Sequence, residues 1–78
     1  MAILLSDLTI GETAIILDIN IDAIPLKLVE MGCLPGNKVK LIQIAPFGDP
    51  FYFNINDSHV AIRKETAEEI TVVLEKNI

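Results

Sequence analysis

Hydrophobic and polar residues alternate along several short stretches of the chain, a pattern typical of strands with one buried face. Four such stretches predict strands over residues 13–19, 39–45, 51–56 and 60–63. A fifth strand is predicted near the end of the sequence, with Ile70, Val72 and Leu74 on its inward face. The chain is therefore predicted to be mainly β.

The 51–56 strand shows this alternation most clearly. Its inward side chains are Phe51, Phe53 and Ile55, and Tyr52 lies on the opposite face. The loop before it, residues 46–50, contains two prolines and a glycine, which favour turns. Residues 56–58 predict a tight hairpin into the next strand. The middle of the chain is thus predicted to be a pair of hairpins.

A helical periodicity follows the first strand. Hydrophobic residues recur there at three-four-three spacing, which lets one stripe face a core; they are Ile21, Ile24, Leu28 and Met31. Asn20 or Asp22 can cap the start of this helix, and Pro25 is tolerated only in its first turn. Gly32 suits the left-handed position that ends a helix.

The remaining segments are predicted to be short connections. Residues 5–11 suggest a loose lead-in, in which Ser6 or Asp7 can cap a single turn. Residues 64–69 are polar and favour one helical turn before the last strand. Five strands with a short helix inserted after the first predict a small closed barrel, because closure hides sheet edges that so aliphatic a chain could not safely expose. The helix would plug one open end.

Composition narrows the possible classes of function. The 78 residues are expected to form one domain, residues 1–78. Of these residues 51% are hydrophobic, and such a surplus favours an apolar outer patch. A net charge of −5 argues against binding nucleic acid or an anionic membrane surface. One cysteine excludes an internal disulfide, and neither a secretory signal nor a membrane-spanning run is evident. A cytoplasmic location without membrane insertion is expected.

No residue set predicts catalysis, a cofactor or a metal site. The phosphate-binding pattern GxxxxGK[ST] is missing from the sequence, so the chain is not expected to bind GTP. Gly48-Asp49-Pro50 is interpreted as part of a turn. His59 lacks partners at metal-ligand spacing and is interpreted as a solvated side chain. Cys33 is interpreted as a buried structural thiol. Ser6 and Ser58 have no general base at a fixed spacing, so the chain is not expected to be an enzyme.

Apolar side chains predicted to face outward are the better functional candidates. Tyr52 opposes the inward face of its strand, Phe47 lies at the tip of its loop, and Leu26 and Val29 lie off the helical stripe. These four residues are the predicted partner-binding residues, since exposed aromatic and aliphatic groups carry much of the energy of interfaces. Single exposed hydrophobic residues are also common on ordinary surfaces, so both interpretations stay open.

Four segments stand in a fixed order along the chain: LSDLTIGE at the start, LVEMGCLPG in the middle, APFGDPFYF at the loop and VAIRKETAEEI near the end. Together they resemble the FeoA family, which comprises small cytosolic proteins of bacterial ferrous iron uptake. The resemblance covers roughly residues 6–74 and rests on their order and spacing together. This sequence departs from the family pattern at the helix. Family members often carry several arginines there, whereas here Leu26 precedes a single cation, Lys27.

The resemblance implies an SH3-like barrel and a non-catalytic accessory role. The implied partner is FeoB, a large membrane transporter with a cytosolic GTP-binding domain, and docking would support its assembly or activity. Two alternatives remain. One is a regulatory interaction domain related to the C-terminal domains of iron-dependent repressors, and the other is a metal chaperone that binds ferrous iron.

Overall fold

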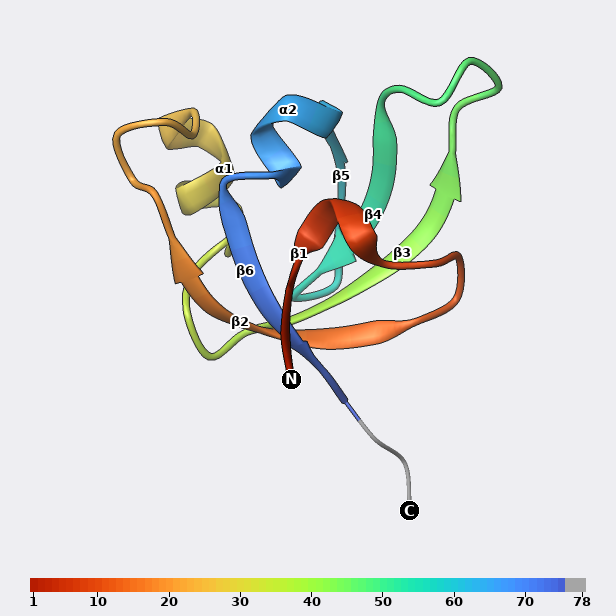
Figure 1. The fold of residues 1–78 in the computed structure, drawn as a ribbon. Coiled ribbons are helices and arrows are strands. Elements are labelled where there is room, and N and C mark those ends of the chain that lie inside the picture. The colour runs from red at the N-terminus through yellow and green to blue at the C-terminus, as the bar shows by residue number, and fades with distance from the viewer. Residues whose placement is uncertain (76–78) are drawn as a thin grey trace.

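All the strands of residues 1–75, the part of the chain that the computed structural model describes, join one antiparallel sheet (Figure 1). The strands are β1 (Ala2–Leu4), β2 (Thr13–Ile19), β3 (Lys38–Ile44), β4 (Phe51–Ile55), β5 (Ser58–Ile62) and β6 (Ile70–Leu74). The helices are the 3-10 turn η1 (Leu5–Asp7), α1 (Leu26–Glu30) and α2 (Lys64–Ala67). The order across the sheet is β1-β6-β2-β3-β4-β5. The mainly β prediction is confirmed; residues 76–78 of the predicted domain lie outside the described part.

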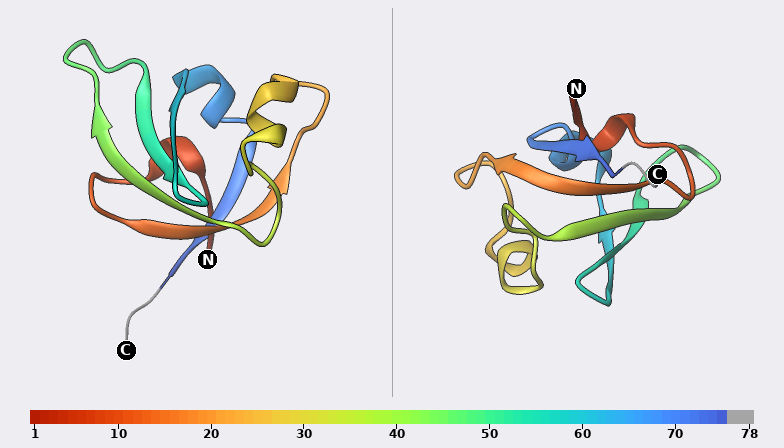
Figure 2. Two further views of the ribbon diagram at one scale, coloured as in Figure 1. Left: turned by 180° about the vertical axis from the view of Figure 1, so that it is seen from behind. Right: turned by 90° about the horizontal axis from the view of Figure 1, so that it is seen from below.

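The sheet is strongly curved but does not close (Figure 2). Register shifts between Ile16 and Asp18 on β2 and between Leu41 and Gln43 on β3 mark bulges, which bend a strand and increase its twist. Within the described residues, β1 and β5 remain unpaired edges at the two ends of the strand order. The predicted closed barrel of five strands is therefore wrong in strand number and in closure. Helices α1 and α2 lie together at one open end (Figures 1 and 2).

The core is built from the inward side chains of the curved sheet. On β4, Phe51, Phe53 and Ile55 are buried while Tyr52 is exposed, so the predicted alternation is confirmed. On β6, Ile70 and Val72 are fully buried, as expected. No polar or charged side chain of residues 1–75 is buried. Packing of aliphatic and aromatic groups therefore supplies most of the stabilisation of this domain.

Residues 5–11 were expected to be a loose lead-in with a single turn; the turn is present as η1, but Leu5 is fully buried and Leu8 beside it is 3% exposed. Strand β1, which precedes these residues and pairs with β6, was not predicted. The Asp7 carboxylate accepts a hydrogen bond from the Leu4 N–H at 3.1 Å, which fits the expected cap of a single turn. A three-residue strand followed by one tight turn is too short to show a period, so its burial is set by tertiary packing.

The helix after β2 is shorter than its hydrophobic stripe suggested. Ile24 and Leu28 are buried, but Ile21 is 62% exposed and precedes the helix, which begins only after Pro25. Neither Asn20 nor Asp22 caps it through a side chain. A proline fixes its own φ and disfavours helical geometry at the residue before it, so the helix starts later than the stripe.

The end of α1 is as predicted. Gly32 has φ +104°, its N–H bonds the Val29 carbonyl oxygen at 3.1 Å, and the Cys33 N–H bonds the Leu28 carbonyl oxygen at 2.9 Å. This pair of bonds is the Schellman arrangement that stops a helix with a left-handed residue. It turns Cys33 into the core, where its side chain is fully buried.

Replacement of Leu5 by alanine should test the role of the N-terminal turn. Removal of a fully buried leucine side chain should lower the free energy of unfolding by about 2–5 kcal/mol. The neighbouring Leu4, which is 37% exposed, provides the matched control, and Leu4→Ala should cost less than about 1 kcal/mol. Urea unfolding followed by circular dichroism measures both. Equal losses for the two variants would contradict the assignment of Leu5 to the core.

Candidate functional site

Phe47 lies at the tip of the loop between β3 and β4 and is entirely exposed. The loop has a defined shape because the Gly48 N–H bonds the Ala45 carbonyl oxygen at 2.8 Å and the Ala45 N–H bonds the Pro50 carbonyl oxygen at 3.0 Å. Gly48 has φ +87°, as its place in a turn predicts. The phenyl ring is thus presented to solvent on an ordered turn.

Asp49 connects this loop to α2. One carboxylate oxygen accepts a hydrogen bond from the Lys64 N–H at 2.9 Å, and the other lies 3.7 Å from the Arg63 guanidinium. The Lys64 N–H is one of the amides that a helix start leaves unpaired, so Asp49 caps α2 from a distant segment. Arg63 lies close in sequence to Glu65 and Glu68, but the carboxylate that it pairs with is that of Asp49. No local spacing could have shown this pair, because Arg63 and Asp49 are fourteen residues apart.

Tyr52 lies on the outer face of β4 and is 43% exposed. Its ring borders a shallow hollow of about 300 Å³, to which Ile42, His59 and Ala61 also contribute. Ile42 is 40% exposed, in phase with the alternation that buries Val39 and Leu41, and the bulge adds Gln43 to the same outer face. The period-two pattern could have placed Ile42 outward, but Ile42 was not among the predicted partner-binding residues.

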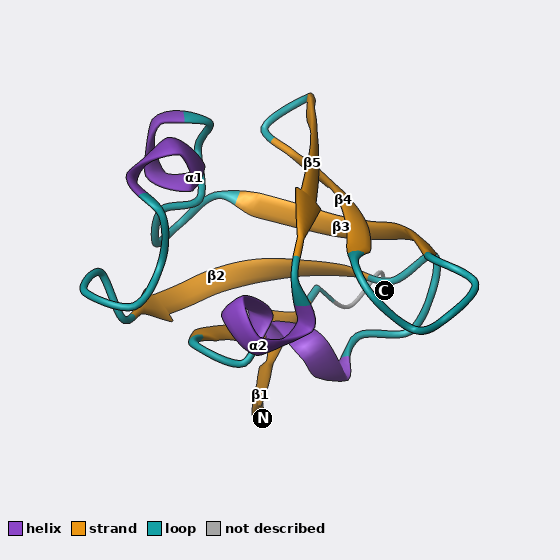
Figure 3. Ribbon diagram, turned by 90° about the horizontal axis from the view of Figure 1, so that it is seen from above, coloured by secondary structure: helices purple, strands orange, loops and turns teal. Residues whose placement is uncertain are grey.

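The other two predicted partner-binding residues lie on α1. Leu26 is 69% exposed, whereas Val29 is half-buried and packs against the core. Helix α1 and the loop that carries Phe47 lie on opposite sides of the molecule (Figures 1 and 3). The structure therefore does not gather Phe47, Tyr52, Leu26 and Val29 into one patch. Tyr52 alone borders a hollow among them.

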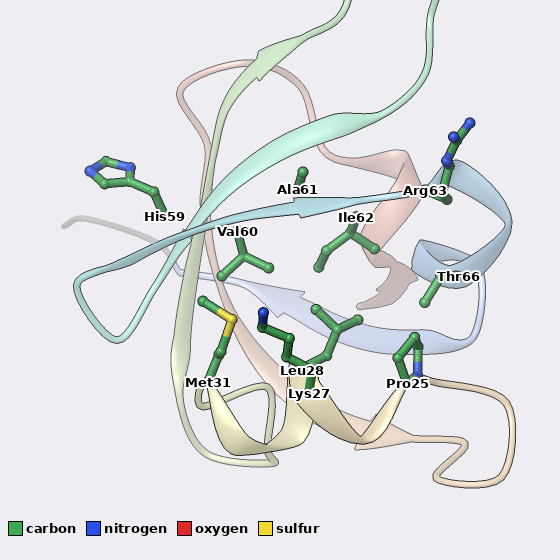
Figure 4. A pocket seen from close by; sticks show the side chains of 10 residues that line it. All are labelled: Pro25, Lys27, Leu28, Met31, His59, Val60, Ala61, Ile62, Arg63 and Thr66. Atoms are coloured by element: carbon green, nitrogen blue, oxygen red, sulfur yellow. The ribbon is translucent and has the colours of Figure 1, made fainter.

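A larger groove of about 410 Å³ runs between α1 and β5 (Figure 4). Val60 and Ile62 of β5 and Leu28 and Met31 of α1 point into the space between the two elements. The remaining residues that line it are Pro25, Lys27, His59, Ala61, Arg63 and Thr66. No aspartate or glutamate is among them. Sequence analysis did not predict this groove, because it forms only when two distant elements meet.

The candidate chemical groups lie apart from one another. Cys33 is fully buried, and desolvation raises the pKa of its thiol to about 11, so the thiolate is disfavoured. His59 is exposed on β5. Within residues 1–75, no group of three or more His, Cys, Asp or Glu side chains is placed to hold a metal ion. Hydrogen bonds from Thr9 lower the pKa of Glu12, which lies in a turn outside both hollows.

A family model and a curated relative both indicate the same family for this chain. The FeoA domain family model matches residues 3–74. A curated relative from Porphyromonas gingivalis, a fusion of Fe(2+) transport protein A with the Fe(2+) transporter FeoB, is 37% identical over 71 residues. That match covers 90% of this chain and only 8% of the relative's length.

Solved structures agree with the fold. The FeoA protein of Chlorobium tepidum has a TM-score of 0.86 at 31% identity, covering 95% of this chain and 71% of that one. The zinc complex of Stenotrophomonas maltophilia FeoA, described as an SH3 domain protein, has a TM-score of 0.73 at 26% identity, covering 94% and 89%. The expected SH3-like fold is thereby confirmed.

Two further solved structures, both under 25% identical, share the fold alone. T. acidophilum IdeR has a TM-score of 0.81 at 22% identity, and the match covers 95% of this chain and 34% of that one. A manganese-dependent transcriptional repressor has a TM-score of 0.79 at 21% identity, covering 95% and 42%. With respect to membranes, α1 and α2 are each at most five residues long, and no helix of residues 1–75 could span a bilayer.

The buried thiol of Cys33 should react only after unfolding. Alkylation by iodoacetamide at mildly alkaline pH should be slower in the native chain than in the urea-unfolded chain by roughly a hundredfold or more, since opening the core requires a few kcal/mol. As pH rises from the ordinary thiol range toward 11, the unfolded chain ionises first, so native stability should fall over that interval. Cys33→Ala should lack this component of the pH dependence. Equal alkylation rates in the two states would contradict the burial of Cys33.

Asp49 should hold the Phe47 loop against α2. Asp49→Ala removes the acceptor of the Lys64 N–H and should lower the free energy of unfolding by about 0.5–2 kcal/mol, the usual cost of a lost helix cap. Asp49→Asn keeps an acceptor oxygen and should retain most of the stability. Thermal unfolding and hydrogen exchange of the Lys64 amide measure the effect. Unchanged protection of that amide in Asp49→Ala would show that the cap does not form.

Proposed function

We propose, on the premise that this chain belongs to the FeoA domain family, that it is a non-catalytic accessory protein of ferrous iron uptake. It docks on the cytosolic region of a FeoB-type transporter and supports the assembly or activity of that transporter. The observation that carries this proposal is the Porphyromonas gingivalis fusion, in which a FeoA segment 37% identical to this chain is covalently joined to FeoB.

A fusion of this kind indicates, on physical grounds, that the two fused modules work in contact. Joining two modules raises their effective concentration and converts an encounter between molecules into an encounter within one chain. Fusion therefore benefits modules that work in contact. Where the modules are separate chains, an interface must supply the affinity that the covalent link supplies in the fusion. The exposed apolar side chains of this chain are suited to such an interface.

A non-catalytic role agrees with what is described for a relative. Stenotrophomonas maltophilia FeoA is described in terms of a ferrous iron transport activating factor. A small rigid module can act on a transporter by binding one of its conformations more tightly than another, which shifts the population toward that conformation. Such an effect requires differential contacts and no chemical step.

Tyr52 and Phe47 are the first candidates for these contacts. Tyr52 borders the outer hollow on β4, and Phe47 is a fully exposed ring on an ordered loop. Aromatic side chains bury a large area at a small cost in conformational entropy, so they dominate many interfaces. Leu26 is a further candidate on α1, and Val29 can contribute only through its exposed part.

The repressor-like alternative has weaker support. Its basis is the shared fold with IdeR at 22% identity, which carries no information on partners. A regulatory domain of that type would act on a transcription factor in place of a transporter. Retention of a winged-helix protein by the tagged chain, in place of a transporter, would favour this alternative.

Alanine substitutions should locate the docking surface. Phe47→Ala and Tyr52→Ala should each weaken association with the host's FeoB-type transporter by roughly tenfold, as expected for a contact worth about 1.4 kcal/mol. Leu17→Ala, which changes a side chain that is 49% exposed on β2, is the matched control and should bind normally. Affinity capture of solubilised membranes with a tagged chain, together with ferrous iron accumulation in cells, measures the effects.

The two possible failures of this experiment differ. If wild-type chain retains no FeoB-type transporter, the proposed function is wrong. If wild-type chain retains the transporter and both folded variants retain it equally well, the function stands and the surface has been misplaced.

A further inference from the structure

We infer that the groove between α1 and β5 binds an extended acidic segment of a partner protein, which adds to β5 as a further strand. This inference goes beyond docking through Tyr52 and Phe47, because it concerns another surface and a different mode of recognition. It holds whichever protein supplies the segment. Three features carry it: an unpaired strand edge, an apolar wall beside that edge, and a cationic rim.

The first feature is the free edge of β5, the last strand in the sheet order. The turn from β4 has two residues, Asn56 and Asp57, with φ of +51° and +65°. In a two-residue hairpin the flanking residues exchange both main-chain bonds, and every second residue repeats this arrangement. Ser58 therefore bonds β4, as do Val60 and Ile62, according to the register.

The main-chain N–H and C=O groups of His59 and Ala61 consequently point away from β4. Among residues 1–75, no turn or loop main-chain bond satisfies these groups. An unpaired edge is a template for another strand, and many peptide-binding domains use such edges. An added segment would exchange main-chain hydrogen bonds with His59 and Ala61.

The second feature is the apolar wall beside that edge (Figure 4). Val60 and Ile62 face the groove from β5, and Leu28 and Met31 face it from α1. A strand added about 4.8 Å from β5 would direct alternate side chains into this space. The volume of about 410 Å³ is in the range of ligand pockets. The fitting segment is therefore extended and apolar at alternate positions.

The third feature is the charge of the rim. The chain carries 11 acidic and 6 basic residues, yet the groove is lined by the cations Lys27 and Arg63 and by no acidic residue. Arg63 pairs with Asp49 outside the groove, so Lys27 is the lining cation without an ion-pair partner among residues 1–75. The groove is thus a local cationic site on an acidic molecule. Acidic residues at the alternate, outward positions of the segment would complement it and speed encounter.

A second copy of this chain fits less well than an acidic segment. Pairing of two β5 edges would bring the Lys27 and Arg63 side chains of two copies together. Like charges placed together at an interface oppose association. A polyproline ligand also fits less well, because its grooves are lined by aromatic residues and this groove has none.

Synthetic peptides provide the test. The probe is the fluorescein-labelled heptapeptide Thr-Glu-Val-Glu-Val-Glu-Thr, and the matched control replaces each glutamate by lysine. In the probe, the main-chain N–H groups of the glutamates would face β5 and donate hydrogen bonds to it. A third peptide carries N-methyl groups on these nitrogens and cannot donate those bonds. Fluorescence anisotropy should show binding of the probe with Kd on the order of 0.1 mM, and binding of the other two at least about tenfold weaker.

Variants of the full chain locate the site. Lys27→Glu should weaken probe binding by about fivefold or more, since it reverses one charge on the rim. Lys40→Glu makes the same charge change at an exposed position on β3 outside the groove and should leave affinity within about twofold. Circular dichroism confirms that both variants are folded. The amide NMR signals of His59 and Ala61 should shift on binding and gain protection from hydrogen exchange.

Four results would overturn the inference. They are equal binding of the acidic and basic peptides, binding that tolerates N-methylation, equal losses in Lys27→Glu and Lys40→Glu, and sedimentation that shows self-association through the β5 edge.

Discussion

A single sheet must enclose its own core in this domain, because no second sheet is present in residues 1–75 to cover the inner face. Curvature is therefore the constraint on which the fold depends. The bulges on β2 and β3 supply part of it, and α1, α2 and η1 fill the space that the curved sheet leaves open. No polar side chain of residues 1–75 is buried in the core. Shape and apolar area, with few specific polar contacts, hold the molecule together.

The parts of this fold that could be predicted from the sequence are those with local causes. The alternation on β4 follows from the inward Phe51 and Phe53, and the end of α1 follows from the left-handed conformation of Gly32. The bulge that turns Gln43 to the outer face and the burial of Leu5 have no local cause. They depend on which strands become neighbours, and that information is spread over the whole chain.

The same division applies to the candidate site. Exposure of Phe47, Tyr52 and Leu26 agrees with the sequence pattern, but their separation across the molecule could not be read from it. The Asp49 contact with α2 and the groove beside β5 arise only in the folded chain. The groove and the Tyr52 hollow share His59, Val60 and Ala61 of β5. Strand β5 thus borders both hollows, and one partner could contact both at once.

The place of β6 in the sheet has a consequence for synthesis of the protein. Strand β1 has β6 as its sole neighbour, and β2 lies between β6 and β3. A ribosome makes β6 last among the strands, so the first strand has no pairing partner until nearly all of the domain has been translated. Pairing over such a long sequence separation is slow to form and leaves apolar residues uncovered in the meantime. The nascent chain is therefore most vulnerable to aggregation just before Ile70–Leu74 leaves the exit tunnel.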